Sequence, residues 1–158
     1  MINRHDLSKF VDWCSILKQK DDKQSQLEVL VVNFICKSSA NQSADILKNQ
    51  VFPLLKKYAE SSFPDVRSAF CEQIHFYLQA INEVKVPKSK YFDKDLKAFF
   101  SLYKKLTTDS GAQLSLFKNC GKILFELSQH SESKYAKDVY KLVEDTLIAF
   151  KGSKSFDS

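Results

Sequence analysis

The chain has 158 residues, of which 44% are apolar and 27% charged, and its net charge is +5. This is the composition of a globular domain and not that of a disordered or membrane-embedded chain. Its 3 glycines and 3 prolines are far below average usage, which leaves too few turn residues for a hairpin-rich sandwich or barrel and for glycine-rich phosphate loops. The composition therefore favours helices.

Apolar residues at three- and four-residue spacing predict seven helices. In chain order these helices cover residues 6–20, 23–38, 44–60, 64–81, 93–106, 109–129 and 132–150. We expect one domain over residues 1–150 and a flexible, polar tail over 151–158.

The first two predicted helices each carry an apolar face. Asp6 is suited to cap the first helix, whose inward residues are Phe10, Trp13, Cys14 and Leu17. The inward residues of the second helix are Leu27, Leu30, Val31, Phe34 and Ile35. Val29 and Val32 widen this arc, so we expect the second helix to be covered on more than one side.

Proline positions organise the third and fourth predicted helices. Ser43 is suited to cap the third helix, and Pro53 inside it predicts a kink or break near Gln50 because proline removes a backbone bond and clashes with the preceding turn. Pro64 suits the first turn of the fourth helix, and Asp65 favours the positive end of its dipole. The inward residues of the fourth helix are Ala69, Phe70, Ile74, Tyr77, Leu78 and Ile81.

A lysine-rich connection over 82–91 leads to the last three helices. The inward residues of the fifth helix are Leu96, Phe99, Phe100, Tyr103 and Leu106. Those of the sixth are Leu114, Phe117, Ile123, Leu124 and Leu127. Those of the seventh are Tyr135, Val139, Leu142, Val143, Leu147 and Phe150.

No arrangement of residues in the sequence points to catalysis. The histidines, His5, His75 and His130, lack a second ligand at metal-binding spacing, and the cysteines form no C-x-x-C pair. Nucleophile-elbow and phosphate-loop motifs are absent. We therefore expect a protein that is not an enzyme and that has no metal and no cofactor, with its four cysteines acting as small apolar residues.

Turns between paired helices recur at a fixed distance. Asp22, Asp65 and Asp109 are separated by 43 and 44 residues, and an apolar residue follows each of them five positions later. The best-defined unit, residues 44–81, contains Pro53-Leu54-Leu55 and then Phe63-Pro64-Asp65-Val66-Arg67. This unit resembles the HEAT repeat of the armadillo-like superfamily. The resemblance implies an all-α, right-handed α-solenoid of about three helix pairs plus a C-terminal helix, with Asp65 at a helix start and Arg67 paired with a carboxylate of a neighbouring helix.

In such a solenoid the second helix of each pair lines a groove. The residues off the core face of these helices are Asn33, Lys37, Glu72, His75, Phe76, Gln79, Lys118 and Lys122. We expect Glu72, His75, Phe76, Gln79, Lys118 and Lys122 to bind a helix or an extended peptide of another protein, with Phe76 as anchor if it is exposed. The alternative is that Phe76 lies in a wide buried arc under the next unit.

The positive charge of the chain is concentrated in one window. Between Val84 and Lys105 there are seven lysines and two aspartates, 7 − 2 = +5. Lys85, Lys88, Lys90, Lys94 and Lys97 form a candidate basic patch for nucleic acid or phosphate, and Tyr91 and Phe92 adjoin it. The alternative is a solvated loop and helix face.

We therefore predict a protein-interaction or scaffold domain that is part of a larger complex or a longer chain. Its rivals are a nucleic-acid- or phosphate-binding helical domain, an oligomerisation module and, for completeness, an enzyme. The sequence lacks an apolar run of ~18 residues and a signal-peptide pattern, so we expect no membrane partner and a cytoplasmic or nuclear location.

Overall fold

The computed structural model describes residues 4–15, 22–129 and 133–153, and every regular element in these ranges is a helix. The elements are α1 (Arg4–Ser15), α2 (Asp22–Lys37), α3 (Ala44–Ile46), the π turn η1 (Leu47–Val51), α4 (Phe52–Ala59), α5 (Pro64–Glu83), α6 (Lys88–Tyr91), α7 (Asp93–Thr107), α8 (Gln113–Ser128), the 3₁₀ turn η2 (Ser133–Tyr135) and α9 (Ala136–Gly152). The predicted all-α class is confirmed.

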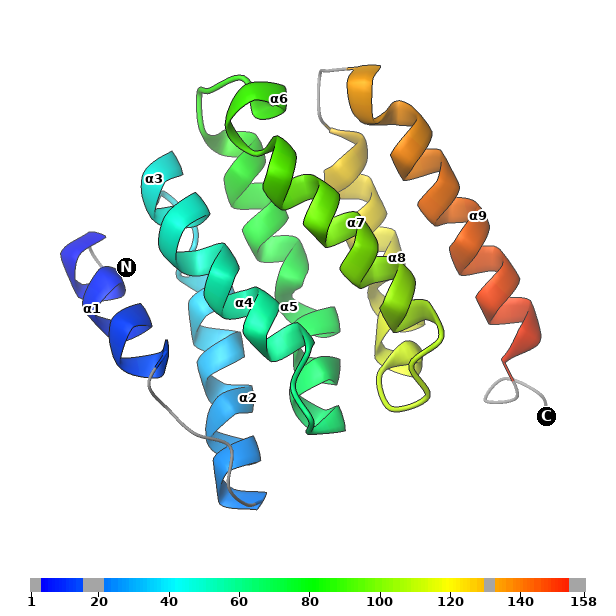
Figure 1. Cartoon of the computed structure of the whole chain (residues 1–158), viewed down its shortest axis with the longest axis horizontal. Helices are drawn as coiled ribbons and strands as arrows, with labels where there is room; N and C mark the ends of the chain where they lie inside the picture. The colour runs from blue at the N-terminus through cyan, green and yellow to red at the C-terminus, as the bar shows by residue number, and fades with distance from the viewer. Residues whose placement is uncertain (1–3, 16–21, 130–132, 154–158) are drawn as a thin grey trace.

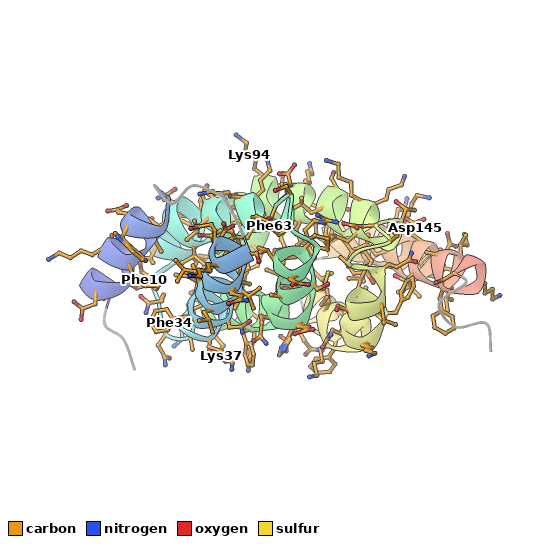
Figure 2. The ribbon with its side chains drawn as sticks, turned by 90° about the horizontal axis from the view of Figure 1, so that it is seen from below. Phe10, Phe34, Lys37, Phe63, Lys94 and Asp145 are labelled. Carbon is orange, nitrogen blue, oxygen red and sulfur yellow. The ribbon has the colours of Figure 1, made fainter. Side chains whose placement is uncertain are left out.

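The helices form two layers (Figure 1). One layer contains α1, α4, α7 and α9, and the other contains α2, α5 and α8. The edge-on view in Figure 2 places Lys94 on the outer side of the first layer and Lys37 on the outer side of the second. Within the second layer α5 packs between α2 and α8, so α5 is the central helix of the structure.

Pro53 determines how the third predicted helix is built. Ser43 caps its start, because the Ile46 N–H donates to Ser43 Oγ at 3.3 Å. The π turn η1 then precedes α4, and the Phe52 N–H bonds to the Leu47 carbonyl five residues back. Since proline clashes with the carbonyl four residues before it, a wider turn at this point relieves the clash. The irregularity predicted near Gln50 is this π turn.

The start of α5 follows from proline and helix-dipole chemistry. Phe63 is the N-cap residue and makes no side-chain cap bond, while Pro64 occupies the first turn as predicted. Asp65 lies in the first turn, where its charge complements the helix dipole. The core is continuous through this helix, which buries Val66, Ala69, Phe70, Cys71, Ile74, Tyr77, Leu78, Ala80 and Ile81.

Several residues predicted to face inward are exposed. On α1 the structure buries Leu7 and Val11 and exposes Trp13. On α2 it buries Val31, Val32, Ile35 and Cys36, and it exposes Leu27, Leu30 and Phe34. On α8 and α9 the exposed members of the predicted inward set are Leu114, Val143, Leu147 and Phe150. The apolar arcs of α2, α8 and α9 are wider than the surfaces that the described helices cover.

Two predicted boundaries differ in detail. The connection predicted over 82–91 is shorter, because α5 continues to Glu83 and α6 forms within the lysine-rich part. Helix α9 continues to Gly152, and the hydroxyl of the buried Ser153 donates to Gln113 Oε1 at 3.3 Å. Residues 154–158 of the predicted tail lie outside the described residues.

Hydrogen bonds between neighbouring helical units recur at a nearly constant sequence separation. The pairs are Arg67–Asp109 at 42 residues, Tyr135–Asp93 at 42, Ser68–Gly111 at 43, Tyr103–Thr146 at 43 and Asn82–Glu126 at 44. This separation matches the 43 and 44 residues between Asp22, Asp65 and Asp109. The sequence period is therefore also the spacing of side-by-side contacts.

Candidate functional site

The predicted partner-binding residues come from two neighbouring helices of the second layer. Helix α5 contributes Glu72, His75, Phe76 and Gln79, and α8 contributes Lys118 and Lys122. Glu72, Gln79, Lys118 and Lys122 are exposed, while His75 and Phe76 are half-buried. Asn33 and Lys37 of α2 are half-buried and exposed, respectively. The packing of α5 on α8 and on α2 therefore brings the predicted residues together on one layer.

Contacts between α5 and α8 fix part of this surface. The Ser115 hydroxyl donates to Glu72 Oε1 at 3.5 Å.

Partial burial lowers the pKa of His75, and the nearby Lys122 ammonium lowers it further. Both causes oppose the charged form and therefore favour the neutral His75 ring.

Phe76 packs against the core instead of projecting from the surface. Its ring lies 4.1 Å from the His75 ring, centroid to centroid. It lines a cavity of about 70 Å³ between the end of α2 and α5, together with Cys36 and Gln79. A cavity of this size has no room for a large side chain of a partner, so the half-buried Phe76 is nearer to the buried-arc interpretation than to an exposed anchor.

A larger groove lies between α2 and α5, closer to the start of α5. We call it the α2–α5 groove; it measures about 470 Å³ and is lined by Gln26, Val29, Leu30, Asp65, Ser68, Ala69 and Glu72. Leu30 is 65% exposed and stands in its wall. Asp65 and Glu72 give the groove two carboxylates. The groove therefore offers an apolar contact beside negative charge.

The Arg67–Asp109 pair joins the first part of α5 to the turn that precedes α8. Arg67 Nε and Nη2 donate to the two oxygens of Asp109 at 2.6 and 3.1 Å, and Nη1 donates to the Ser61 carbonyl at 2.8 Å. Burial alone would raise the pKa of Asp109, but the bonds from Arg67 and from the Gly111 N–H outweigh it and lower the pKa. Arg67 pairs with a carboxylate as predicted, but Asp109 lies in the turn between α7 and α8 and not on a neighbouring helix.

The predicted basic patch is less uniform than its sequence suggests. Lys88 turns toward the chain: its ammonium donates to the Val84 and Val86 carbonyls at 2.5 and 3.1 Å. Lys97 pairs with Asp93 at 3.2 Å. Lys85, Lys90 and Lys94 are exposed. Among the described residues, these three exposed lysines make neither backbone bonds like those of Lys88 nor an ion pair like that of Lys97.

The two aromatic residues beside the patch are already engaged within the molecule. Phe92 is fully buried in the core. The Tyr91 hydroxyl donates to Asp45, and Lys48 lies over the Tyr91 ring at 4.8 Å. Stacking on a nucleic-acid base would require both rings to leave these positions.

Metal-ligating and nucleophilic side chains do not gather in the described part of the chain. No group of three or more His, Cys, Asp or Glu side chains with metal-binding geometry occurs among these residues. Burial raises the pKa of the Cys36 thiol, and burial together with Asp109 raises that of Cys71 to about 12. His130 lies outside the described residues. None of the described helices combines the length and apolarity required to cross a bilayer.

Sequence reasoning missed Leu30 as a surface residue because it counted Leu30 toward the core. The run Val29-Leu30-Val31-Val32 is apolar on every side of a helix, so some of its members had to face something other than the core. The width of this apolar arc was the feature of the sequence that could have indicated an exposed apolar residue on this helix.

Comparisons with known proteins give no relative. No protein-family model matches the chain, and neither the curated proteins nor the solved structures contain a match.

Proposed function

We propose that this chain is a HEAT-like α-solenoid module that binds another protein through the outer side of α2, α5 and α8. Three observations support the repeat architecture: the two helix layers, the 42–44-residue spacing of lateral hydrogen bonds, and the Arg67–Asp109 pair. Arg67 bonds the aspartate that stands 44 residues after Asp65, which is the type of ladder contact that the resemblance implies.

The α2–α5 groove is the observation that carries the binding proposal. An exposed leucine in the wall of a concave surface retains apolar area that a partner can remove from water. The carboxylates of Asp65 and Glu72 favour a partner segment in which an apolar side chain is flanked by lysine or arginine. The ligand is thus a helix or an extended peptide with basic flanks.

The test is selection of peptides from a displayed random library on the immobilised protein. We expect enrichment of peptides with an apolar residue between basic ones, and loss of their binding with Leu30→Glu and with Glu72→Lys. Leu30 is exposed, so Leu30→Glu should leave the circular dichroism spectrum and the melting temperature unchanged. Leu147→Glu, an exposed leucine of α9 outside the groove, serves as the matched control. Absence of enrichment, or binding that survives Leu30→Glu, would contradict the proposal.

A second experiment separates nucleic-acid binding from protein binding. Lys85, Lys90 and Lys94 are exposed, and a Lys→Glu variant at these three positions removes this cluster. Binding of labelled single-stranded and duplex oligonucleotides is measured at 50 and 200 mM salt, because phosphate binding weakens steeply over this range. Salt-sensitive binding that the lysine variant abolishes and Leu30→Glu spares would favour the nucleic-acid function instead.

A further inference from the structure

Seven of the eleven exposed large apolar side chains of the described residues lie on α8 and α9, at the C-terminal edge of the molecule. Helix α9 lies at the end of its layer, and α8 lies at the same end of the other layer (Figure 1). Tyr140 is 67% exposed, Leu147 54% and Phe150 43%. Single exposed apolar residues need no explanation, but a contiguous group of them marks a contact surface.

These residues form a regular row on α9. The row follows alternating spacings of four and three residues: Ala136, Tyr140, Val143, Leu147 and Phe150. That is the spacing of residues that pack against another helix in a coiled coil. The core side of α9 lies elsewhere on the helix, at Leu142 and Thr146, which are its buried residues. The row therefore borders the buried side of α9 that attaches the helix to the domain.

A second row with the same spacing lies on α8. Its members are Leu114 and Gly121, which are exposed, Leu124, which is half-buried against the core, and Phe117, which is buried. The two rows meet where the rings of Phe117 and Phe150 pack edge to face, with centroids 5.6 Å apart. Gly121 is exposed, and a Cβ placed on it would meet nothing within 4 Å. Together the rows form an apolar surface between two packed helices, which we call the end valley.

A comparison with α7 shows that the row on α9 is unusual even within this molecule. Tyr103 of α7 bonds to Thr146 of α9, 43 residues later. Adding 43 to a residue number of α7 therefore gives the corresponding position on α9. Under this shift Tyr140 and Leu147 correspond to Lys97 and Lys104, which are both exposed. At these two row positions α9 thus carries apolar side chains where α7 carries charge, whereas Val143 and Phe150 correspond to the buried Phe100 and Thr107. Such an exchange costs solubility unless a partner covers the side chains.

The rim of the end valley has a positive excess. Three lysines and one glutamate, all exposed, border the two rows: Lys118, Lys137, Lys151 and Glu144. A second copy of α9 would place lysines against lysines, whereas acidic residues would pair with them. We propose that the end valley binds an amphipathic helix of another polypeptide, whose apolar row is flanked by Asp and Glu. This site is distinct from the α2–α5 groove and does not depend on it.

The test uses two synthetic peptides that are stapled into a helix and carry a fluorophore. Both have leucine and alanine at heptad positions a and d; one has glutamate and the other lysine at the flanking positions e and g. We expect the glutamate peptide to bind at least about tenfold more tightly at 50 mM salt, with a smaller difference at 500 mM. We expect Leu147→Glu to weaken its binding by at least about tenfold, because the new carboxylate is buried unpaired.

Two further variants make the outcome specific. Leu30→Glu lies in the α2–α5 groove and should leave binding of the glutamate peptide unchanged. A Lys137→Glu, Lys151→Glu double variant should reverse the preference toward the lysine peptide. Leu147 and both lysines are exposed, so circular dichroism should report an unchanged fold.

Four results would overturn the proposal. The first is absence of binding by either peptide, and the second is binding that survives Leu147→Glu. The third is a concentration-dependent dimer in sedimentation that Leu147→Glu disperses, because the occupant would then be a second copy of this chain. Loss of peptide binding in Leu30→Glu alone would place the contact in the α2–α5 groove and would likewise count against the end valley.

Discussion

Arg67 and Asp109 are 42 residues apart in the sequence and are joined by two parallel hydrogen bonds of 2.6 and 3.1 Å. Their side chains are only 19% and 20% exposed. Two fixed bonds between planar groups are geometrically more demanding than a simple ion pair. The pair therefore sets the position of α5 relative to the turn before α8.

Asp109→Asn should lower the free energy of unfolding by about 1–3 kcal/mol at pH 7, because a partly buried guanidinium loses its charged partner. The folded-state pKa of Asp109 is lowered. The stabilisation is thus present above the unfolded pKa of about 4 and is lost as the pH falls through the lowered folded value. Denaturant unfolding at pH 7 and at low pH measures this. Glu144→Gln, at an exposed position inside α9, is the control, and a difference that does not shrink in acid would contradict the expectation.

Gly111→Ala should destabilise the protein, and Gly121→Ala should stabilise it. A Cβ on Gly111 would lie 2.8 Å from Arg67 Nη2 and 2.9 Å from Pro64 Cβ, so it would displace the arginine or the start of α5. A Cβ on Gly121, inside α8, would meet nothing within 4 Å, and alanine favours a helix by about 1 kcal/mol over glycine. Thermal unfolding of the two variants should move in opposite directions, and a shift of the same sign in both would contradict this.

Thr146→Val should cost about 1–2 kcal/mol of stability, although the two side chains have nearly the same shape. The Thr146 hydroxyl donates to the Leu142 carbonyl at 2.6 Å, so its oxygen accepts the hydrogen of Tyr103, also at 2.6 Å. Valine would leave the buried Tyr103 hydroxyl without this acceptor. In a double-mutant cycle with Tyr103→Phe the two losses should be less than additive. Thr108→Val, at an exposed position, is the control, and full additivity would show that the contact carries no energy.

Lys88→Met should lower the stability by about 1 kcal/mol, whereas Lys90→Met should change it by less than about 0.5 kcal/mol. The Lys88 ammonium donates to two carbonyls just after the end of α5, where backbone acceptors lack helical partners. Lys90 is exposed. Chemical denaturation of the two variants measures the difference. Equal stabilities would mean that the Lys88 bonds add nothing to the folded state.

Much of the fold could be predicted because local rules are strong in helices. Apolar spacing located the main helices, Ser43 marked a cap, and Pro53 marked the π turn. The Asp–Val–Arg turn also led to the expectation that Arg67 pairs with a neighbouring carboxylate. Each of these features depends on residues within one or two turns, or on a motif with one dominant geometry.

The exposed faces could not be predicted for a physical reason. A three- and four-residue spacing shows which side of a helix is apolar. It does not show whether another helix of the same chain covers that side. Leu30 and Leu147 were therefore assigned to the core, and both are exposed. Lys88 presents the same difficulty for charge, because a lysine count does not reveal which ammonium groups turn toward backbone carbonyls.

The lateral hydrogen bonds at separations of 40 to 44 residues also have a consequence for the order of folding. Each bond closes a loop of about one repeat, so the entropy lost on loop closure is similar for every repeat. No repeat requires the N-terminal and C-terminal parts of the chain to meet. Such a chain frays inward from its edges, and α5, with neighbours on both sides, is the last to open. Amide exchange should therefore be faster in α9 than in α5, and a ligand bound at the C-terminal edge should slow the exchange of α9 amides.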